Sequence, residues 1–403
     1  MPRNQLPPQI RKLQLPTKTG RDGVRYEVRA DTGYRNGKRT QYRRRFRTER
    51  EARDALAAVR GDTHHGTYVH PNTLTVQAVV DGWLASKHRI KPSTRSGYET
   101  TLAPVVETYG TLPVQQLTRR HVDELVGLLR AGGTTTARGT TRGKWPPRTV
   151  NYMLTILTAA LDQPVRDGLL VRNPAKHVDR IPAEPRETTT WTQDQAATFL
   201  GRDHGRYRVA WMLALYGLRR GEICGLRWVD INLQDRMITI ANTRVVAGKQ
   251  VHEGTPKSAR SRRHLPLSDD LRDAIKAERK RQAADRLAMG GAWVESGYVV
   301  VQADGSPVSP GALSSRWVHA VQKAGVPVIR LHDARHTCAT VMHLQGVPIA
   351  VVAQWLGHAS AAFTMATYAH SQDPALKVAA SSVPVVANRG NNDAHKSTGT
   401  TDM

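Results

Sequence analysis

Cysteine, phenylalanine and acidic residues are scarce in this 403-residue chain, and long apolar runs are absent. Its two cysteines, Cys224 and Cys338, are too few for a disulfide-stapled scaffold, which predicts a reduced, intracellular protein without structural disulfides. No stretch of about 18 apolar residues occurs, so a membrane-spanning helix is not expected. The first residues include Pro and Arg where a secretory signal would need an apolar segment, and no such signal is expected either.

The shortage of acidic residues leaves the chain strongly positive. It has 59 Lys and Arg against 34 Asp and Glu, a formal net charge of +25 at pH 7. Such an excess on a globular composition favours a polyanionic partner, with DNA or RNA first. An anionic membrane surface is the competing interpretation, but no basic amphipathic helix with a bulky aromatic face is present. We therefore expect a cytoplasmic, nucleoid-associated protein that does not act at a membrane.

The N-terminal segment predicts a small sheet packed by one helix. VRYEVRA alternates apolar and polar residues, RNGK supplies an Asn-Gly turn, and RTQYRRRFR follows as a second strand. Thr48 and Glu51 then have the spacing of a helix capping box. We assign Arg43, Arg44 and Arg45 of the second strand to DNA binding, since arginines there can reach phosphates or base edges. The alternative is a solvated edge strand that its charge keeps from aggregating.

The rest of the chain divides into a helical and a mixed region. Apolar residues recur at helical spacing from Thr75 to about Val178, which predicts about four helices and one long loop, AGGTTTARGTTRGKWPP. RIPAEPRET predicts a linker, because its prolines stop a helix, and the end after Asn388 is polar. About three domains of the usual size, roughly 150 residues, fit this length. The expected parts are a sheet-and-helix domain (1–65), a helical domain (72–180), a mixed α/β domain (188–380) and a disordered tail (381–403).

The mixed region contains a series of chemically active side chains. In chain order they are Arg219, Lys257, His332, Arg335, His358 and Tyr368. RVAWMLALYG predicts a helix ended by Gly217, and LRRGEICGLRW begins another, which places Arg219 near a helix start. Strand-like runs broken by turn residues place Lys257 in or beside a hairpin turn. His332 and Arg335 are three residues apart in LHDARHTCAT, hence on one helix face.

These motifs resemble those of the tyrosine recombinases, the phage integrase family. YGLRRGEICGLRW, TPKSARSRRHLPL, LHDARHTCAT, WLGHAS and TYAH stand in the family's order and at its usual separations. RTVNYMLTILTAALDQPVRDGLLVRNPA is similar to the end of the family's helical core-binding domain, and the N-terminal sheet is similar to the arm-binding domain of larger phage integrases. The resemblance implies a multidomain, mostly α fold with α+β parts: a small N-terminal β-sheet plus helix, a helical (SAM-like) bundle and a mixed α/β catalytic domain.

The resemblance also implies a role for each of the six residues. The implied nucleophile, arginine pair and assisting residues are Tyr368; Arg219 and Arg335; and Lys257, His332 and His358. Physical chemistry agrees, because a phosphodiester under attack gains negative charge that planar, permanently charged guanidinium forks can stabilise. No cofactor or metal ion is expected, and the chain has no G-x-x-x-x-G-K-[ST] phosphate loop.

A tyrosine hydroxyl needs help to attack at neutral pH, because its ordinary pKa is about 10. His332 is the expected general base, aided by the arginines, and Lys257 is the expected general acid for the departing 5′ oxygen. His358 is expected to donate a hydrogen bond to the phosphate. The product would be a 3′-phosphotyrosyl link, a covalent intermediate that a different 5′ hydroxyl can attack.

Three charged residues near the motifs leave alternatives open. Glu222 either orients catalytic side chains or is a carboxylate favoured by the N-terminus of a helix. Arg220, next to Arg219, is expected to be a surface charge. Lys249 also sits at a turn and competes with Lys257, which is preferred because TPKS resembles the family's form.

Two further residue types could suggest other chemistry. His332 and His336 at i, i+4 imitate the helical pair of zinc enzymes, but position 333 is Asp rather than Glu, and Arg335 would repel a cation. His336 is therefore expected to pack or to support the site. Cys338 is expected to be a small buried hydrophobe rather than a nucleophile.

The expected function is site-specific DNA recombination by an integrase of a phage or integrative element, through a 3′-phosphotyrosyl intermediate and a Holliday junction. Expected partners are double-stranded DNA attachment sites and a homotetramer; a directionality factor and a DNA-bending host protein are further candidates. The alternatives are a type IB topoisomerase-like enzyme, against which the arm-like N-terminus argues, and an inactive DNA-binding regulator, against which the full catalytic set argues. The segment after Tyr368 could dock on a neighbouring protomer or on its own subunit.

Overall fold

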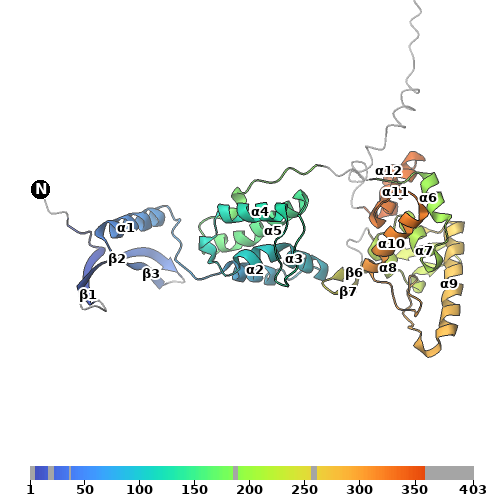
Figure 1. Ribbon diagram of the computed structural model, residues 1–403, viewed down its shortest axis with the longest axis horizontal. Coiled ribbons are helices and arrows are strands. Elements are labelled where there is room, and N and C mark those ends of the chain that lie inside the picture. The colour runs from blue at the N-terminus through green and yellow to red at the C-terminus, as the bar shows by residue number, and fades with distance from the viewer. Residues whose placement is uncertain (1–4, 17–21, 36–37, 185–188, 256–260, 359–403) are drawn as a thin grey trace, which may run out of the picture. The chain divides into compact units, whose positions relative to one another are not determined.

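A computed structural model of the chain describes the following residues (Figure 1): 5–16, 22–35, 38–184, 189–255 and 261–358. Packing divides the chain into two compact units, Met1–Pro185 and Arg186–Met403, and each is described by itself. Lys257, Tyr368 and the tail 381–403 lie outside the described residues. None of the helices described is long and apolar enough to cross a membrane.

The first unit begins with a three-stranded antiparallel sheet in the order β1-β2-β3. Its elements are β1 (Ile10–Pro16), β2 (Asp22–Arg35), β3 (Lys38–Phe46) and α1 (Glu49–His64). Helix α1 covers one face of the sheet, where Val28 and Ala30 pack with Leu56 (Figure 1). The capping box of Thr48 and Glu51 is confirmed, with the Thr48 side chain accepting from the Glu51 backbone at 3.2 Å.

Strand β1 was not predicted, because the regular alternation that indicates a strand begins only at VRYEVRA. The sequence IRKLQLP does not alternate regularly, because Arg11 and Lys12 are adjacent; Ile10 is buried opposite Val28 on β2, whereas Arg11, Lys12 and Gln14 are exposed. A strand without a regular apolar pattern is stabilised mainly by pairing with its neighbour. The predicted two-stranded hairpin of β2 and β3 is therefore part of a three-stranded sheet with β2 at its centre.

A helical bundle follows in the first unit, as predicted. Its helices are α2 (Val76–Ala85), α3 (Pro92–Tyr109), α4 (Arg119–Ala131) and α5 (Pro147–Arg166), with short 3-10 turns η1 (Val114–Gln116) and η2 (Pro174–His177). Helix α5 is buried along one face by residues at three- and four-residue spacing, among them Val150, Leu154, Leu157 and Leu161. The apolar cluster of the bundle is separate from that of the sheet, and the predicted loop between α4 and α5 contains no helix.

In residues 189–255 and 261–358, the second unit mixes helices with two small sheets. Its helices are α6 (Gln193–Leu200), α7 (Arg208–Leu215), α8 (Arg220–Gly225), α9 (Asp269–Met289), α10 (Pro310–Ala324), α11 (Leu331–Leu344) and α12 (Ile349–Leu356), with 3-10 turns η3 (Gly205–Tyr207), η4 (Trp228–Asp230) and η6 (Gly290–Ala292). Its strands are β4 (Ile231–Asn232), β5 (Met237–Ile240), β6 (Thr243–Ala247), β7 (Gln250–Gly254) and β8 (Arg263–Pro266). They form an antiparallel β4-β5-β8 sheet and a β6-β7 hairpin.

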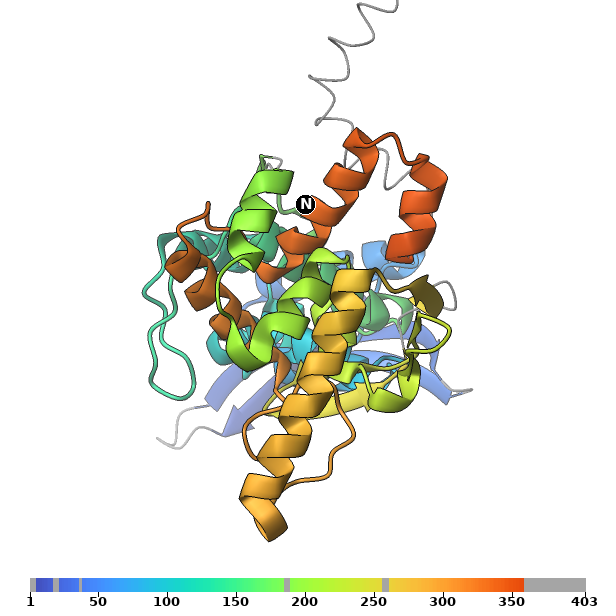
Figure 2. The ribbon, with the colours of Figure 1, turned by 90° about the vertical axis from the view of Figure 1, so that its right-hand side faces the viewer.

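Helix α7 lies at the centre of this unit and makes contacts with α6, α8, α9 and α11. In Figure 2 the long α9 crosses the front of the unit, and α11 lies beside α12. Trp191, Phe199, Trp211 and Trp317 form a fully buried aromatic cluster around α7, and the indole N–H of Trp317 donates to the Ile329 carbonyl at 2.8 Å. This rigid core holds the ends of α7, α8, α11 and α12, where the candidate site lies.

Candidate active site

Arg219 is fixed at the start of α8, as the sequence predicted. It is the N-cap residue, with extended backbone angles, and its side chain is partly exposed. One terminal nitrogen donates to Glu222 Oε1 at 2.7 Å, and the other donates to the Gly357 carbonyl at 3.0 Å. The guanidinium therefore connects the start of α8 to the end of α12.

Arg335 reaches the same place from α11 and is almost fully buried. Its Nη1 donates to the Gly217 carbonyl at 2.5 Å, and its Nη2 donates to the Leu356 carbonyl. Leu356 and Gly357 are consecutive, so the two arginines hold adjacent carbonyls at the end of α12. The structure thus brings together Arg219 and Arg335, which are far apart in the sequence.

Gly217 makes this meeting possible. Its φ of +95° lies in the left-handed region that favours glycine. A Cβ at this position would stand 2.8 Å from Leu356 Cδ2 and 3.2 Å from Cys338 Sγ. Any side chain here would separate α7 from α11 and α12, and it would disturb the carbonyl that Arg335 binds.

Glu222 connects Arg219 to a third arginine that sequence reasoning missed. The buried Arg263 of β8 donates to Glu222 Oε2 at 3.0 Å through Nη2 and to the Trp355 carbonyl at 2.6 Å through Nε. Burial by itself would raise the pKa of Glu222, but Arg263 and Arg219 outweigh it and lower that pKa. Glu222 also accepts from the Arg219 backbone N–H at 3.0 Å as a capping residue, so it both contacts the side chain of Arg219 and caps the start of α8.

Arg263 could have been found from the period of its strand. Ser261, Arg263, Leu265 and Leu267 are buried, whereas Arg262 and the other intervening residues are exposed. A cation on the apolar face of a strand requires a buried anion, and Glu222 is that anion.

His358 follows the α12 carbonyls directly and is partly buried. Burial, with Arg335 and Arg219 next in importance, lowers its pKa to about 4. The imidazole is therefore neutral at pH 7 and has one N–H to donate. The structure places His358 beside both arginines, as its predicted role requires.

His332 and His336 stand one turn apart on α11, with ring centroids 5.1 Å apart and ring planes nearly perpendicular. Although the His332 side chain is exposed, desolvation by the surrounding protein lowers its pKa. The charges of His336 and Arg335 lower it further. Burial likewise lowers the pKa of His336. A neutral His332 can accept a proton. Among the described residues, no three His, Cys, Asp or Glu side chains are arranged to hold a metal ion.

A pocket of about 540 Å³ joins Arg219 to His332. Ser314 and Val318 of α10 form part of its wall, and Arg220 lines its edge. Arg220 is exposed, as predicted, and donates to Ser314 Oγ at 3.0 Å. An anionic group entering this pocket would meet cationic side chains and a neutral imidazole.

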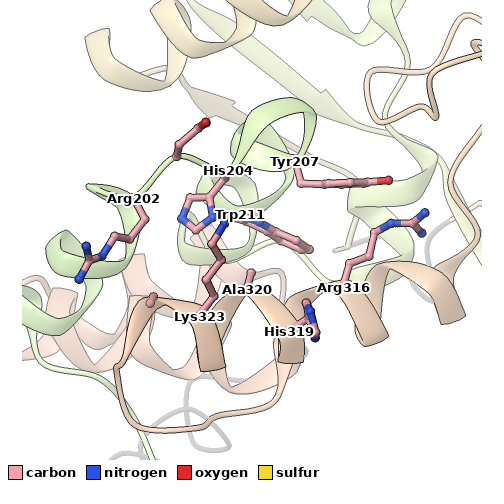
Figure 3. A pocket seen from close by; sticks show the side chains of 10 residues that line it. Arg202, His204, Tyr207, Trp211, Arg316, His319, Ala320 and Lys323 are labelled. Carbon is pink, nitrogen blue, oxygen red and sulfur yellow. The ribbon is translucent and has the colours of Figure 1, made fainter.

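A second pocket, of about 570 Å³, lies elsewhere in the unit between η3 and α10. Figure 3 shows Arg316 and Lys323 of α10 extending toward Tyr207 and His204. The Arg316 guanidinium lies over the Tyr207 ring, 5.0 Å from its centroid. None of the four predicted catalytic residues that the structure describes lines this pocket.

The remaining residues considered from the sequence are Lys257, Tyr368, Lys249 and Cys338. Lys257 and Tyr368 lie outside the described residues, so their proximity to the arginines remains a prediction; Lys249 is exposed at the turn of the β6-β7 hairpin. Cys338 is buried, and burial raises the pKa of its thiol to about 12, which suits a hydrophobe and not a nucleophile.

The arginines predicted to bind DNA alternate on β3. Arg43 and Arg45 point to the sheet face away from α1 and contact the buried Glu27. Arg44 pairs in register with Val28 on the α1 side and lies over the Phe46 ring, 5.6 Å from its centroid. Neither Glu27 nor its third partner, Arg29, was singled out from the sequence.

Known proteins resemble this chain in sequence. The phage integrase family matches residues 190–374. The XerC-like tyrosine recombinase of Caldanaerobacter subterraneus subsp. tengcongensis is 29% identical in an alignment of 240 residues that covers 55% of this chain and 60% of that protein. The integrase of Mycobacterium phage FRAT1 is 26% identical over 298 residues, 73% of this chain and 83% of that protein.

Solved structures resemble its fold. The Tn1549 transposon integrase, determined with circular intermediate DNA, has a TM-score of 0.60 and 19% identity, covering 77% of this chain and all of that one. A lambda integrase tetramer bound to a Holliday junction has a TM-score of 0.54 and 17% identity, covering 90% and 96% of the two chains. The solved structures show that the chain has the fold of these integrases. The matches in sequence, with the predicted order of motifs, identify residues 190–374 as a domain of the phage integrase family, to which the tyrosine recombinases belong.

Proposed function

We propose that this protein is a site-specific DNA recombinase that cuts and rejoins DNA through a 3′-phosphotyrosyl intermediate and a Holliday junction. The observation that carries the proposal is the convergence of Arg219 and Arg335 on adjacent carbonyls beside His358. Two guanidiniums fixed in this way form a site for one phosphate, because the fold already orients them and little side-chain entropy is lost when DNA binds.

The arginine pair acts on the charge of the transition state. When an oxygen attacks a phosphodiester, negative charge grows on the non-bridging oxygens, and fixed cationic donors stabilise that charge more than the ground state. Glu222 and Arg263 act as positioning residues, since Glu222 holds Arg219 from one side while Arg263 holds Glu222 and α12.

The histidines supply proton transfer and a hydrogen bond. A neutral His332 at the pocket edge accepts the proton of the Tyr368 hydroxyl as that oxygen attacks phosphorus. The neutral His358 donates its N–H to a non-bridging oxygen. Lys257 protonates the 5′ oxygen as its bond to phosphorus breaks, so the strand leaves as a 5′ hydroxyl and its 3′ end stays on Tyr368. These roles of Lys257 and Tyr368 rest on the resemblance.

The DNA partners and the assembly also belong to the proposal. The relatives include integrases of mycobacteriophages and an integrase of the Bacillus subtilis element ICEBs1, which supports the integrase of a phage or integrative element. The lambda integrase tetramer on a Holliday junction supports a homotetramer on two duplexes. A directionality factor and a DNA-bending protein would set the direction of recombination at the nucleoid.

We assign the parts of the first unit to two DNA contacts. The sheet and helix of residues 1–65 would bind arm-type sites, and the bundle of residues 72–180 would bind the core site together with the catalytic domain, residues 188–380. Their separate apolar clusters support this division, and so does the positive charge of the chain.

Covalent trapping tests the proposal. A nicked duplex made from the DNA that flanks this gene in its genome would be incubated with wild type, Tyr368→Phe and Tyr152→Phe, a control at an exposed tyrosine of α5. Wild type and the control should form a denaturant-resistant adduct at one position. Tyr368→Phe should form none while binding the duplex within a few fold. An adduct with Tyr368→Phe would contradict the assignment, and plasmid relaxation without strand exchange would favour a topoisomerase.

A further inference from the structure

Glu27 is an unusual residue on the face of the N-terminal sheet that α1 does not cover. Its side chain is only 1% exposed, because three arginine side chains surround it. The Nε of Arg29 donates to it at 2.6 Å, that of Arg43 at 2.9 Å and that of Arg45 at 3.3 Å. Burial alone would raise the pKa of Glu27, but Arg43, Arg29 and Arg45 lower it to about 2, so the carboxylate stays ionised at any physiological pH.

The register explains how four residues from two strands meet. Glu27 lies opposite Arg45, and Arg29 lies opposite Arg43, all on one face because side chains alternate along a strand. Arg11, exposed on β1, is opposite Glu27 as well. We call Glu27, Arg29, Arg43 and Arg45 the Glu27 cluster. It carries three positive charges around one negative charge.

The hydrogen bonds to Glu27 leave the terminal amino groups of each arginine available to contact DNA. Each hydrogen bond to Glu27 is made by Nε, so the carboxylate does not use the terminal amino groups that form the guanidinium fork. The side chains of Arg43 and Arg45 remain 57% and 50% exposed. A mobile arginine loses rotamer freedom when it docks on DNA, whereas these side chains are already ordered.

We propose that Glu27 is a positioning residue that holds Arg29, Arg43 and Arg45 in fixed orientations, so that the arginines of the Glu27 cluster can read base edges in duplex DNA. The inference rests on the proposed arm-type DNA binding and names the residues that carry its sequence preference. Guanidinium forks pair with the O6 and N7 acceptors of guanine in the major groove, which suits an exposed sheet face. Arg44 lies on the other face of β3 and is not part of the Glu27 cluster.

Net charge alone and the loss of arginine positioning predict different effects of removing Glu27 on DNA binding. Glu27→Gln deletes a negative charge from a DNA-binding face, which by charge alone should tighten binding to every duplex. The amide of Gln keeps one acceptor oxygen and places an NH₂ group among three cationic donors, so it cannot hold the three arginine side chains in position. Preference for the cognate sequence should therefore fall while affinity for unrelated DNA is kept or rises.

The test uses the full chain and duplexes selected from a random library by wild type. We expect two enriched motifs, one of which depends on the N-terminal sheet and is lost in Arg29→Ala/Arg43→Ala. The ratio of affinities for that duplex and its scrambled version is then measured by fluorescence anisotropy for wild type, Glu27→Gln, Glu27→Asp and Arg50→Ala. Arg50→Ala removes one exposed positive charge from α1, away from this sheet face, and is the matched control. The second motif and the thermal midpoint report on folding.

Glu27→Gln should lower the ratio on the order of tenfold, the loss of about one base contact, with scrambled-duplex affinity unchanged or higher. Glu27→Asp should restore part of the ratio, and Arg50→Ala should keep it. An unchanged ratio in Glu27→Gln, or an equal loss for both duplexes, would overturn the inference while leaving arm-type binding in place. If no wild-type motif depends on the sheet, the arm assignment itself fails, and the inference fails with it.

Discussion

The buried ion pair of Arg263 and Glu222 offers a stability prediction that also reports on the site. The side chains are 6% and 1% exposed, so neither charge has much access to water. Arg263→Met fills a similar volume but leaves Glu222 buried with Arg219 alone. Breaking a buried pair by removing one partner costs about 3–5 kcal/mol, and the remaining Arg219 favours the lower end, ~3 kcal/mol. The control, Arg262→Met, changes the exposed neighbour and should cost less than about 0.5 kcal/mol.

The cost of Arg263→Met should depend on pH with a definite sign. In wild type the pKa of Glu222 lies below its usual value, so the carboxylate contributes stability above the unfolded pKa and loses it as pH falls through the folded pKa. Without Arg263, burial dominates and raises the pKa of Glu222, which can then be neutralised by a proton in the folded protein. The difference from wild type should therefore be largest near pH 7.5 and smaller at pH 5.5.

Urea unfolding followed by tryptophan fluorescence at the two pH values measures this difference. The aromatic cluster around α7 reports on the unit that holds the pair. A cost of about 3 kcal/mol would lower the melting temperature of a unit of this size by roughly 6–12 °C. A cost below about 1 kcal/mol, or one independent of pH, would refute the argument that the pair is buried and mutually dependent.

Further predictions concern the site and the arm. Gly217→Ala should destabilise the second unit by about 2–3 kcal/mol in thermal unfolding, whereas Gly325→Ala, also at positive φ but with open space for a Cβ, should cost only the backbone term of about 1 kcal/mol; equal costs would remove the packing argument. The NMR titration midpoint of His358 in the DNA-free protein should lie below pH 5.5, and a midpoint near 6.5 would contradict its burial beside the arginines. Adduct formation should be unchanged in EDTA, because guanidiniums stabilise the phosphate; loss that Mg²⁺ restores would show a metal requirement. Deleting residues 1–65 should abolish arm-type binding and leave core cleavage, and equal binding of both probes after deletion would refute the arm assignment.

Elements with strong local patterns were predictable from the sequence. The helix ended by Gly217, the restart at Arg219 and the capping box of Thr48 all follow from short-range chemistry that does not depend on the rest of the fold. The bundle helices have three- and four-residue apolar periods that only a buried helix face requires.

Contacts between distant segments could not be predicted in the same way. Strand β1 lacks a regular apolar alternation, and its pairing with β2 is a tertiary event. Nothing in the local sequence says that Arg335 binds the carbonyls of Gly217 and Leu356, because those residues are distant in the chain and carbonyls carry no side-chain pattern.

Charged residues were the hardest to interpret. The run of Arg43, Arg44 and Arg45 looked like one basic patch, but strand alternation sends Arg44 to the opposite face. Glu27 and Arg263 were not singled out from the sequence, and both are buried partners of opposite charges. Period-two burial could have located Arg263, whereas the burial of Glu27 depends on arginines from a neighbouring strand.

Mapping the covalent link tests the central claim most directly. The adduct between wild-type protein and the nicked duplex would be digested with protease and nuclease, and the nucleotide-bearing peptide would be sequenced by tandem mass spectrometry. The account predicts a nucleotide joined through a 3′ phosphate to Tyr368, with its yield strongly reduced in Arg335→Ala because the phosphate loses a fixed cation. A nucleotide on any other residue, or full yield without Arg335, would contradict the claim that this arginine pair activates a phosphodiester for attack by Tyr368.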